Sequence, residues 1–302
     1  MTDDLSAVAT LTAVTKRLGG KPVLEGFDLA IRAGEVTALL GPNGAGKTTG
    51  VGLLTGRLIP DAGTARLFGL DPRRPAVRGR MGVMLQAAGL PDVMTVSEMV
   101  ALQSGYYVHA RPLMETLALA GLADLGERRC GTLSGGQARR VQYALAICGR
   151  PDLLILDEPT AAMDRGSARA LWATVCEAAD TGTGVLLTSH DLAEADALAD
   201  RVVVLDRGRI VADDTPGAIR ARVGGSVIRC RTQIAAAVLH AMPGVREVEA
   251  EGAELRIVTR DAPTTLRRLL DADPTVTDLR VGNATLEDAI AALLAPPHRI
   301  AA

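Results

Sequence analysis

Three short runs of mainly apolar residues interrupt the polar pattern of the first two thirds of the chain. They occupy positions 36–40 (VTALL), 153–156 (LLIL) and 185–189 (VLLTS). Because the apolar positions within each run are nearly continuous rather than alternating, they predict strands that are buried on both faces. Each run is followed by polar or glycine residues and then by a stretch that fits a helix. This succession predicts an α/β domain with a parallel sheet.

The ends of these predicted strands carry candidate functional residues. In open α/β sheets, ligands bind beyond the carboxyl ends of the strands. In this chain the residues at those ends are the segment from Gly41 onward, Asp157 with Glu158, and His190. We expect these residues to line one pocket if the three strands are neighbours.

The pattern between residues 89 and 150 differs from that of the predicted strands. Few β-branched residues cluster there, and stretches that fit helices cover 96–108 and 111–122. We therefore predict a helical subdomain at about 89–150 that is inserted into the sheet domain. The first predicted domain, 1–222, ends at a change of composition near residues 220–225.

The segment after this change, 226–295, has a different order of elements. Its pattern predicts strand, helix, strand, strand, helix and strand, followed by a closing helix at 286–294. This is the order of a small ferredoxin-like α+β module. We therefore predict a second, accessory domain over these residues.

Composition narrows the class of protein. Hydrophobic residues make up 48% of the 302 positions, which is enough for a substantial core, although only 2% of the residues are aromatic. The net charge is −2 and no basic run occurs, so charge gives no reason to expect nucleic-acid binding. The start of the sequence lacks the apolar region of a signal peptide, and the apolar runs are far shorter than the roughly 18 residues of a spanning helix. We therefore expect a soluble, cytoplasmic protein.

Two residue types are informative because they are rare. The four cysteines are widely separated and form no C-x-x-C pair, which favours buried thiols in a reducing compartment over a disulfide framework or a metal site. Lysine occurs only at positions 16, 21 and 47, since arginine is used almost everywhere else. Lys47 therefore stands out, because it lies in a glycine-rich stretch where a flexible ammonium group suits a phosphate.

The glycine-rich stretch GPNGAGKTT follows the first predicted strand and precedes a predicted helix. It fits the pattern G-x-x-x-x-G-K-[ST] in the structural context that this pattern requires. Its glycines let backbone N–H groups surround phosphates, Lys47 can reach the β- and γ-phosphates, and the Thr48 hydroxyl can bind Mg²⁺. The predicted nucleotide-binding residues of this phosphate loop are Gly41, Pro42, Asn43, Gly44, Ala45, Gly46, Lys47, Thr48 and Thr49.

The stretch LLILDEP is a second candidate element, in which an apolar strand ends in two carboxylates. Burying these charges is costly unless a cation or a nucleotide uses them. We assign Asp157 to Mg²⁺ and Glu158 to the polarisation of an attacking water. A D-E pair after a strand is often only a helix cap, but the phosphate loop upstream favours the functional interpretation. The predicted fold class is therefore α/β, a P-loop NTPase sheet core with an inserted helical subdomain, plus a small α+β ferredoxin-like domain.

The stretch LSGGQ at 133–137, the signature segment, raises a separate question because it also suits an anion. Ser134, Gly135 and Gly136 can form a nest of backbone N–H groups at a helix start. The plain alternative is a serine-capped helix with flexible glycines, and the stretch taken alone favours this alternative. Its neighbours change the interpretation, because GPNGAGKTT, LSGGQ, LLILDEPT and TSHDLAEA occur in this order in one chain.

In this combination the motifs closely resemble those of the ATP-binding subunits of ABC transporters, over about residues 8–222. The resemblance implies that two such subunits pair head to tail and enclose two ATP molecules with Mg²⁺. Ser134, Gly135, Gly136 and Gln137 of one chain would then contact the γ-phosphate held by the phosphate loop of the other. The implied partners are a second copy of the chain and separately encoded transmembrane permease subunits. The chain would thus lie at the inner face of the cell membrane.

The resemblance also assigns three residues by position. Gln86 matches the family's Q-loop glutamine, which senses Mg²⁺ or the lytic water and couples to the membrane subunits. His190 matches the switch histidine that contacts the γ-phosphate. Asp164 matches the aspartate of the D-loop, which lies at the dimer seam.

Two positions depart from the family pattern. The family usually places an aromatic residue that stacks on adenine ahead of the first core strand, where this chain has Leu18. The D-loop reads AAMDR where the family commonly has Gly-Leu-Asp-Pro, so Ala162 is larger than the usual residue and no proline follows Asp164. The phosphate-loop lysine and both carboxylates are present, and we expect an active ATPase.

The segment after residue 225 resembles the C-terminal extension of drug and antibiotic exporter ATPases of the daunorubicin-resistance type. Element order and the closing NATLEDA stretch carry this resemblance, which implies an exporter subunit; the segment itself either regulates and contacts a partner or only stabilises the chain. Two other functions stay open, an importer subunit and a soluble ABC-type ATPase of translation or DNA maintenance. The sequence disfavours the soluble ATPase. Translation factors carry two cassettes and chromosome-maintenance members carry long coiled coils, whereas this sequence has one phosphate loop and no heptads.

Overall fold

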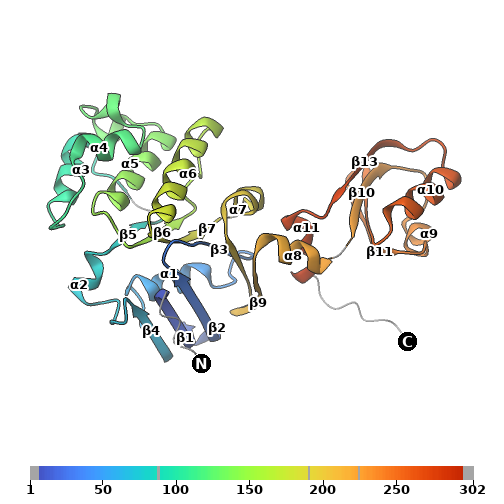
Figure 1. The fold of residues 1–302 in the computed structure, drawn as a ribbon, viewed down its shortest axis with the longest axis horizontal. Coiled ribbons are helices and arrows are strands. Elements are labelled where there is room, and N and C mark those ends of the chain that lie inside the picture. The colour runs from blue at the N-terminus through green and yellow to red at the C-terminus, as the bar shows by residue number, and fades with distance from the viewer. Residues whose placement is uncertain (1–6, 87–88, 190, 224, 295–302) are drawn as a thin grey trace. The chain divides into compact units, whose positions relative to one another are not determined.

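The computed structural model of the chain describes residues 7–86, 89–189, 191–223 and 225–294 (Figure 1). It divides into two compact units, Met1–Asp213 and Asp214–Ala302. The change of composition along the sequence predicts this boundary later, between residues 222 and 226. The difference is helix α8 (Pro216–Val223), which groups with the second unit because it packs against α11 (Leu286–Leu294).

A six-stranded sheet forms the centre of the first unit. Its strands in spatial order are β5 (Met81–Met84), β6 (Leu153–Asp157), β7 (Gly184–Thr188), β3 (Val36–Leu40), β8 (Arg201–Asp206) and β9 (Arg209–Asp214). Strand β3 pairs in parallel with β7, which pairs in parallel with β6. The three strands predicted from the apolar runs are therefore neighbours, and their carboxyl ends meet at one edge of the sheet.

The central sheet is buried on both faces, as the continuous apolar runs predict. Every residue of β6 is buried, and alternate side chains enter different cores because successive residues of a strand point to opposite faces. Leu154 and Leu156 pack in a core with α5 (Gly135–Ile147) and α6 (Arg165–Asp180). Leu153 and Ile155 pack on the other side, in a core with α1 (Lys47–Leu54) and a second sheet.

This second sheet has three antiparallel strands and was not predicted from the sequence. Its strands in spatial order are β2 (Lys21–Arg32), β1 (Ala7–Leu18) and β4 (Ala62–Leu67). The pairing of β1 with β2 is irregular at several points, so the alternation of buried and exposed residues along β1 is interrupted. The two remaining helices of the first unit outside the helical segment are α2 (Pro75–Arg78) and α7 (Leu192–Leu198).

Helices fill the segment between β5 and β6, in the region where the sequence predicts a helical subdomain (Figure 1). They are α3 (Val96–Ser104), α4 (Leu113–Leu119), the 3₁₀ turns Ala123–Leu125 and Cys130–Thr132, and α5. Thr95 and Glu98 form a capping box that starts α3. A second capping box starts α5, at the signature segment.

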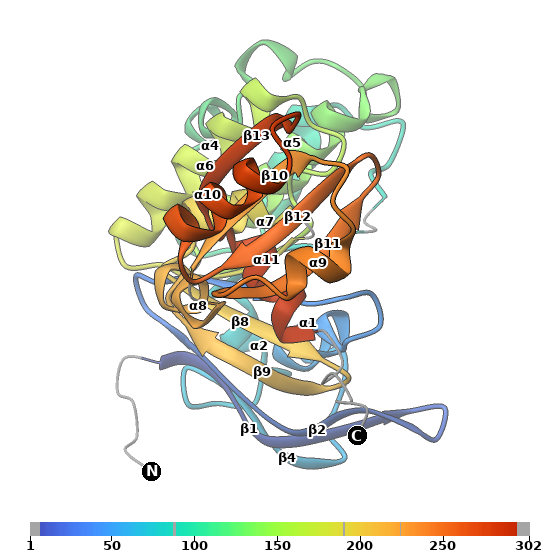
Figure 2. The same cartoon turned by 90° about the vertical axis from the view of Figure 1, so that its right-hand side faces the viewer.

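The second unit contains a four-stranded antiparallel sheet in the order β11-β12-β10-β13 (Figure 2). Its elements along the chain are α8, β10 (Ser226–Arg231), α9 (Ala236–His240), β11 (Val245–Glu251), β12 (Glu254–Thr259), α10 (Ala262–Ala272), β13 (Thr277–Asn283) and α11. Ile228 and Ile257 pack with Leu239 of α9 and Leu269 of α10 on one face of the sheet. The order and pairing of these elements are those of the predicted ferredoxin-like module.

Candidate active site

The phosphate loop runs from the end of β3 into the first turn of α1. Gly46, the residue before α1, has a φ of 116°, and a Cβ atom at this position would lie 2.7 Å from the Leu24 side chain. Only glycine fits there, because the backbone is left-handed and the space is filled. Pro42, Asn43, Gly44 and Thr48 are exposed, whereas Ala45, Gly46 and Thr49 are buried and Gly41 is partly buried.

Lys47 folds back over the phosphate loop. Its Nζ donates hydrogen bonds to the carbonyl oxygens of Gly41 at 2.5 Å and Pro42 at 3.2 Å. Burial lowers the pKa of Lys47 below that of a free lysine, and the nearby carboxylates of Glu158 and Asp157 oppose this shift. The ammonium group thus lies among carbonyl oxygens of the phosphate loop. A bound phosphate would be a stronger partner for it than these neutral carbonyls are.

Asp157 and Glu158 lie where β6 ends, beside the end of β7. The Asp157 carboxylate is 6% exposed and accepts a hydrogen bond from the Thr188 hydroxyl. The Glu158 backbone N–H donates to the Thr188 carbonyl at 3.0 Å, and Glu158 has a φ of 52°. Left-handed backbone at a residue other than glycine is strained, and such strain concentrates at functional sites. His190, assigned to this same edge, lies outside the described residues.

The donor set at this edge fits Mg²⁺. Thr48 is exposed on the first turn of α1, which follows β3. The Asp157 carboxylate lies at the end of β6, at the same edge of the sheet. In the part of the chain that the structure describes, no group of three or more His, Cys, Asp or Glu residues is placed to hold a metal. A few protein oxygens with the remaining positions left to phosphates and waters is the arrangement that Mg²⁺ prefers.

Gln86 is exposed and lies two residues after the end of β5. Its carbonyl oxygen accepts a hydrogen bond at 3.3 Å from Arg139 of α5. Since β5 pairs in parallel with β6, Gln86 leaves the sheet at the same edge as Asp157 and Glu158. The structure therefore brings the predicted Q-loop residue to the edge that also holds the phosphate loop.

The signature segment is the amino-terminal end of α5. The Ser134 hydroxyl accepts from the Gln137 N–H at 3.3 Å, and the Gln137 side chain accepts from the Ser134 N–H at 3.0 Å. Ser134 and Gly135 are exposed. A Cβ atom on Gly136 would lie 3.1 Å from the Ala162 carbonyl oxygen, so this glycine lets α5 approach the D-loop closely. In the single chain these residues thus act as a capping box that packs on the D-loop.

Asp164 ends the D-loop and caps α6. Its carboxylate accepts from the N–H groups of Gly166 at 2.9 Å and Ser167 at 3.0 Å. Hydrogen bonds from Ser167 hold the pKa of Asp164 below its usual value. Ala162, where the family pattern has glycine, has a φ of 65°, which is a left-handed conformation. Leu18, the other departure, is 43% exposed beside the turn between β1 and β2.

Sequence reasoning missed the residue that connects these elements, Arg139. Its side chain is buried among the carbonyl oxygens of Leu85, Gln86, Asp157 and Glu158. The signal was present in the helix pattern, because Arg139 lies on the same face of α5 as the buried residues Gln142, Tyr143 and Ala146. An arginine within a buried stripe indicates a specific set of acceptors.

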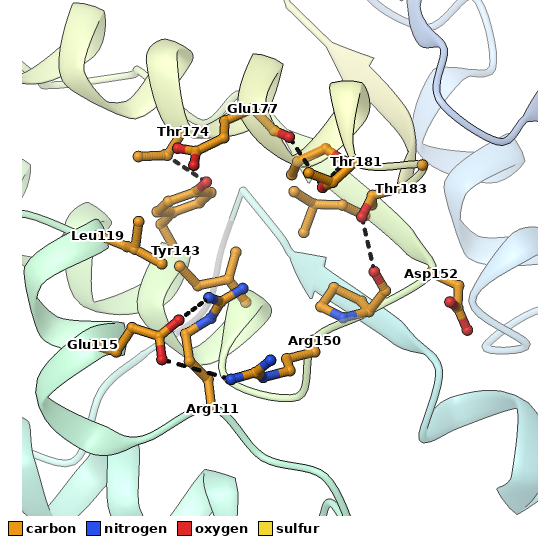
Figure 3. A pocket seen from close by; sticks show the side chains of 15 residues that line it. Arg111, Glu115, Leu119, Tyr143, Arg150, Asp152, Thr174, Glu177, Thr181 and Thr183 are labelled. Carbon is orange, nitrogen blue, oxygen red and sulfur yellow. Dashed lines mark hydrogen bonds and ion pairs between the residues drawn. The ribbon is translucent and has the colours of Figure 1, made fainter.

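A cavity of about 450 Å³ lies at the other edge of the central sheet (Figure 3). It is lined by residues that precede β6 and follow α6, together with Arg111, Glu115 and Tyr143. The Glu115 carboxylate pairs with Arg111 at 2.5 Å and with Arg150 at 3.6 Å, and the Tyr143 hydroxyl bonds Thr174 at 2.7 Å. Because its groups bind one another and lie away from the phosphate loop, this cavity is not part of the candidate site.

Known proteins share these features. Residues 24–161 match the family model described as ABC transporter. The daunorubicin/doxorubicin resistance ATP-binding protein DrrA of Streptomyces peucetius is 38% identical over 277 residues, which cover 89% of this chain and 79% of that protein. A Nod factor export ATP-binding protein I of Burkholderia lata is 38% identical over 226 residues, covering 71% of this chain and 73% of that protein.

Solved structures agree with the fold. A structure described as the ATP-binding subunit of an ABC transporter superimposes with a TM-score of 0.67 at 26% identity, and the match covers 71% of this chain and 92% of that one. A dimeric ATP-binding cassette bound to ADP and phosphate gives a TM-score of 0.63 over 68% of this chain and 98% of that one, at 23% identity, and supports the fold alone. In the described parts of the chain, no helix is long and apolar enough to cross a membrane. The chain belongs to the ABC transporter family, as an ATP-binding subunit that hydrolyses ATP to energise a transporter.

Proposed function

We propose that two copies of this chain pair head to tail around two ATP molecules with Mg²⁺ and power a separately encoded permease that exports a drug or an antibiotic. Export and the class of cargo rest on the names of two similar proteins, a daunorubicin/doxorubicin resistance ATP-binding protein and a Nod factor export ATP-binding protein. Residue roles rest on the meeting of the phosphate loop, Asp157 with Glu158, and Gln86 at one edge of the sheet. That meeting is the observation that carries the proposal.

Each residue at this edge has a role in the proposed reaction. Lys47 binds the phosphates, Thr48 and Asp157 hold Mg²⁺, and Glu158 polarises the water that attacks the γ-phosphate. Bound Mg²⁺ supplies charge neutralisation for the phosphate oxygens. Gln86 senses the occupied site and passes the signal toward the permease.

The proposed head-to-tail arrangement follows from what the signature segment contacts. Gly135 and Gly136 pack on the D-loop, and Ser134 is exposed, whereas Lys47 contacts the carbonyls of its own phosphate loop. In the proposed dimer, ATP held by the phosphate loop of the second copy is the ligand of Ser134, and two-fold symmetry repeats this contact at the other site. The helix start then adds N–H donors to an anion that the first copy already holds.

Mixing two inactive variants tests this arrangement. Lys47→Ala disables the phosphate loop, and Ser134→Arg blocks the signature segment, so each homodimer should hydrolyse ATP very slowly. A mixed dimer has one site with both elements intact, so refolding the two together should restore roughly a quarter of wild-type turnover by random pairing. The control is the double variant mixed with Lys47→Ala, which has no intact site. If the first mixture stays as inactive as this control, the head-to-tail arrangement is wrong.

The permease partner is proposed from an exposed apolar surface in the helical segment. Val93, Tyr106, Val108 and Met114 are 77%, 75%, 92% and 66% exposed within this segment. Contiguous patches of exposed apolar side chains mark interaction sites, and we propose that these four side chains form one such patch. We therefore propose the contact with a membrane subunit at this surface.

A pull-down of the tagged chain from detergent-solubilised membranes of its host tests the partner. The wild-type chain should retain a stoichiometric protein with several membrane spans, identified by mass spectrometry. The double variant Tyr106→Asp/Val108→Asp should lose it, because it places two charges in the proposed contact. Ile59→Asp, at another exposed apolar side chain, is the matched control and should retain it. Recovery of only ribosomal or DNA-repair proteins by the wild type would refute the transport function.

A further inference from the structure

Arg139 is the most deeply placed charge of the signature helix. It lies one turn inside α5 and is 7% exposed, whereas Ser134 at the helix start is exposed. Nη1 donates to the carbonyl oxygens of Leu85 at 3.0 Å and Gln86 at 3.3 Å, and to the Gln142 side chain at 2.7 Å. Nη2 donates to the carbonyl oxygens of Asp157, at 3.1 Å, and Glu158.

The two ends of the guanidinium therefore hold two different loops. Nη1 binds the chain where it leaves β5, and Nη2 binds the chain where it leaves β6. A rigid fork fixes the distance between its two sets of acceptors, which a lysine ammonium cannot do. Arg139 thus sets the spacing between the main chain at Gln86 and the main chain at Glu158, and ties both to α5.

The surroundings of the Arg139 guanidinium show that its burial is energetically unfavourable. Burial lowers the pKa of Arg139, and the carboxylates of Asp157 and Glu158 oppose that shift. Among the described residues, Arg139 Nε is buried and has no hydrogen-bond partner. A buried charge whose main partners are carbonyl oxygens is an expensive way to stabilise a fold, and hydrophobic packing would serve stability better.

We propose that Arg139 is a positioning residue, which couples the signature helix to the Gln86 loop and to the main chain of Glu158. A ligand that contacts Ser134 pushes on one end of α5, and the guanidinium one turn further along transfers that displacement to both loops. Glu158 is held in a left-handed conformation, so its side-chain direction depends on the restraint at its carbonyl. This inference rests on the proposed roles of Gln86 and Glu158.

The first test is the turnover of Arg139→Lys, which keeps the charge but loses the fork. We expect kcat to fall by about 10- to 100-fold, the effect of a small misplacement of catalytic groups. The dissociation constant for ATP, measured on the monomer, should stay within about twofold because Lys47 and the phosphate loop are unchanged. Arg140→Lys is the matched control, since Arg140 donates to the Gly121 carbonyl in the helical segment. Wild-type kcat in Arg139→Lys, or an equal loss in Arg140→Lys, would overturn the proposal.

Gln142→Glu tests the same proposal without removing the arginine. A carboxylate at this position attracts Nη1 more strongly than the amide does, so it draws the fork away from Leu85 and Gln86. We expect a several-fold lower kcat with a melting temperature equal to or above that of the wild type. A purely structural role for Arg139 predicts unchanged kcat in this variant, and that result would refute the proposal.

Combining Arg139→Lys with Gln86→Ala distinguishes a positioning role of Arg139 from a general loss of structure. If Arg139 acts through the Gln86 loop, Arg139→Lys should lower kcat much less in this background than in the wild type. Full additivity would contradict the proposal. Glu158→Gln distinguishes the underlying roles: wild-type turnover in that variant would remove the basis of the proposed function, whereas its inactivity together with an active Arg139→Lys removes only the inference about Arg139.

Discussion

Arg139 in the first unit and Arg256 in the second are both buried, at 7% and 3% exposed, but their guanidinium groups are satisfied in different ways. The main-chain carbonyls of two loops surround Arg139. Carboxylates surround Arg256, with Asp288 at 2.8 Å, Glu249 at 3.0 Å and Glu247 at 3.4 Å. Each arginine also has one buried nitrogen without a hydrogen-bond partner among the described residues.

Arg139 therefore holds main-chain segments in place, whereas Arg256 joins elements of secondary structure. Glu247 and Glu249 lie on β11 beside β12, and Asp288 lies on α11, so Arg256 joins the sheet to the closing helix. Asp288 also accepts from the Thr285 N–H at 2.8 Å, which starts α11. These acceptors are side chains on regular elements. Apart from the Gln142 side chain, the acceptors of Arg139 are main-chain carbonyls at the ends of β5 and β6, beside candidate catalytic residues, so its loss should lower kcat.

The variant with the largest expected effect on stability tests the role of Arg256 in the second unit. Arg256→Met removes the nearer of the two arginines that pair with the Asp288 carboxylate, which is 2% exposed, and leaves only Arg229 at 3.1 Å. Breaking a buried pair in this way typically costs roughly 3 to 5 kcal/mol. Hydrogen exchange should show lost protection in residues 226–294 and unchanged protection in the central sheet of the first unit.

Arg280→Met is the matched control for that experiment. Arg280 lies on β13 of the same sheet, is 68% exposed at its side chain, and pairs with Glu254 at 3.2 Å. Exposed pairs contribute about 1 kcal/mol or less, so this variant should unfold close to the wild type. If the amides of residues 226–294 are as well protected from exchange in Arg256→Met as in Arg280→Met, the carboxylate cluster does not hold the second unit together. The contrast with Arg139 is then lost.

Elements with strong local periodicity were predictable in both units. The predicted strand 36–40 matches β3, and the predicted helix 286–294 matches α11, because each is decided by the pattern of its own residues. The candidate site was partly predictable for the same reason, since parallel neighbours bring Gly41 and Asp157 to one edge. The boundary between the units depends on more than local pattern, because α8 groups with the second unit through its contact with α11, far along the chain.

What could not be predicted depends on contacts that local patterns do not contain. Arg139 and Arg140 are adjacent and chemically identical, yet one holds the loops after β5 and β6 and the other holds Gly121. The sheet of β1, β2 and β4 was missed because irregular pairing disturbs its alternation. Ser134 caps its own helix in the single chain, so the interpretation as an anion site depends on a second copy.

The smallest predicted effect concerns strain beside the loops that Arg139 holds. Ala162 has a φ of 65°, and its carbonyl lies against Gly136 at the start of α5. An L-residue pays about 1 to 2 kcal/mol for left-handed backbone, while glycine loses somewhat more entropy on folding. Ala162→Gly should therefore raise the free energy of unfolding by about 0.5 to 1 kcal/mol, measured by urea denaturation.

Ala13→Gly shows whether that strain matters for activity. Ala13 has a φ of 50° in β1, outside the candidate site, so its replacement should give a similar gain in stability with unchanged kcat. Ala162→Gly should instead lower kcat by about twofold, because a freer D-loop holds the start of α5 less firmly, although Arg139 still holds the helix one turn further along. If both variants gain stability and keep wild-type kcat, the strained alanine is incidental, and positioning at this end of α5 depends on the Arg139 fork.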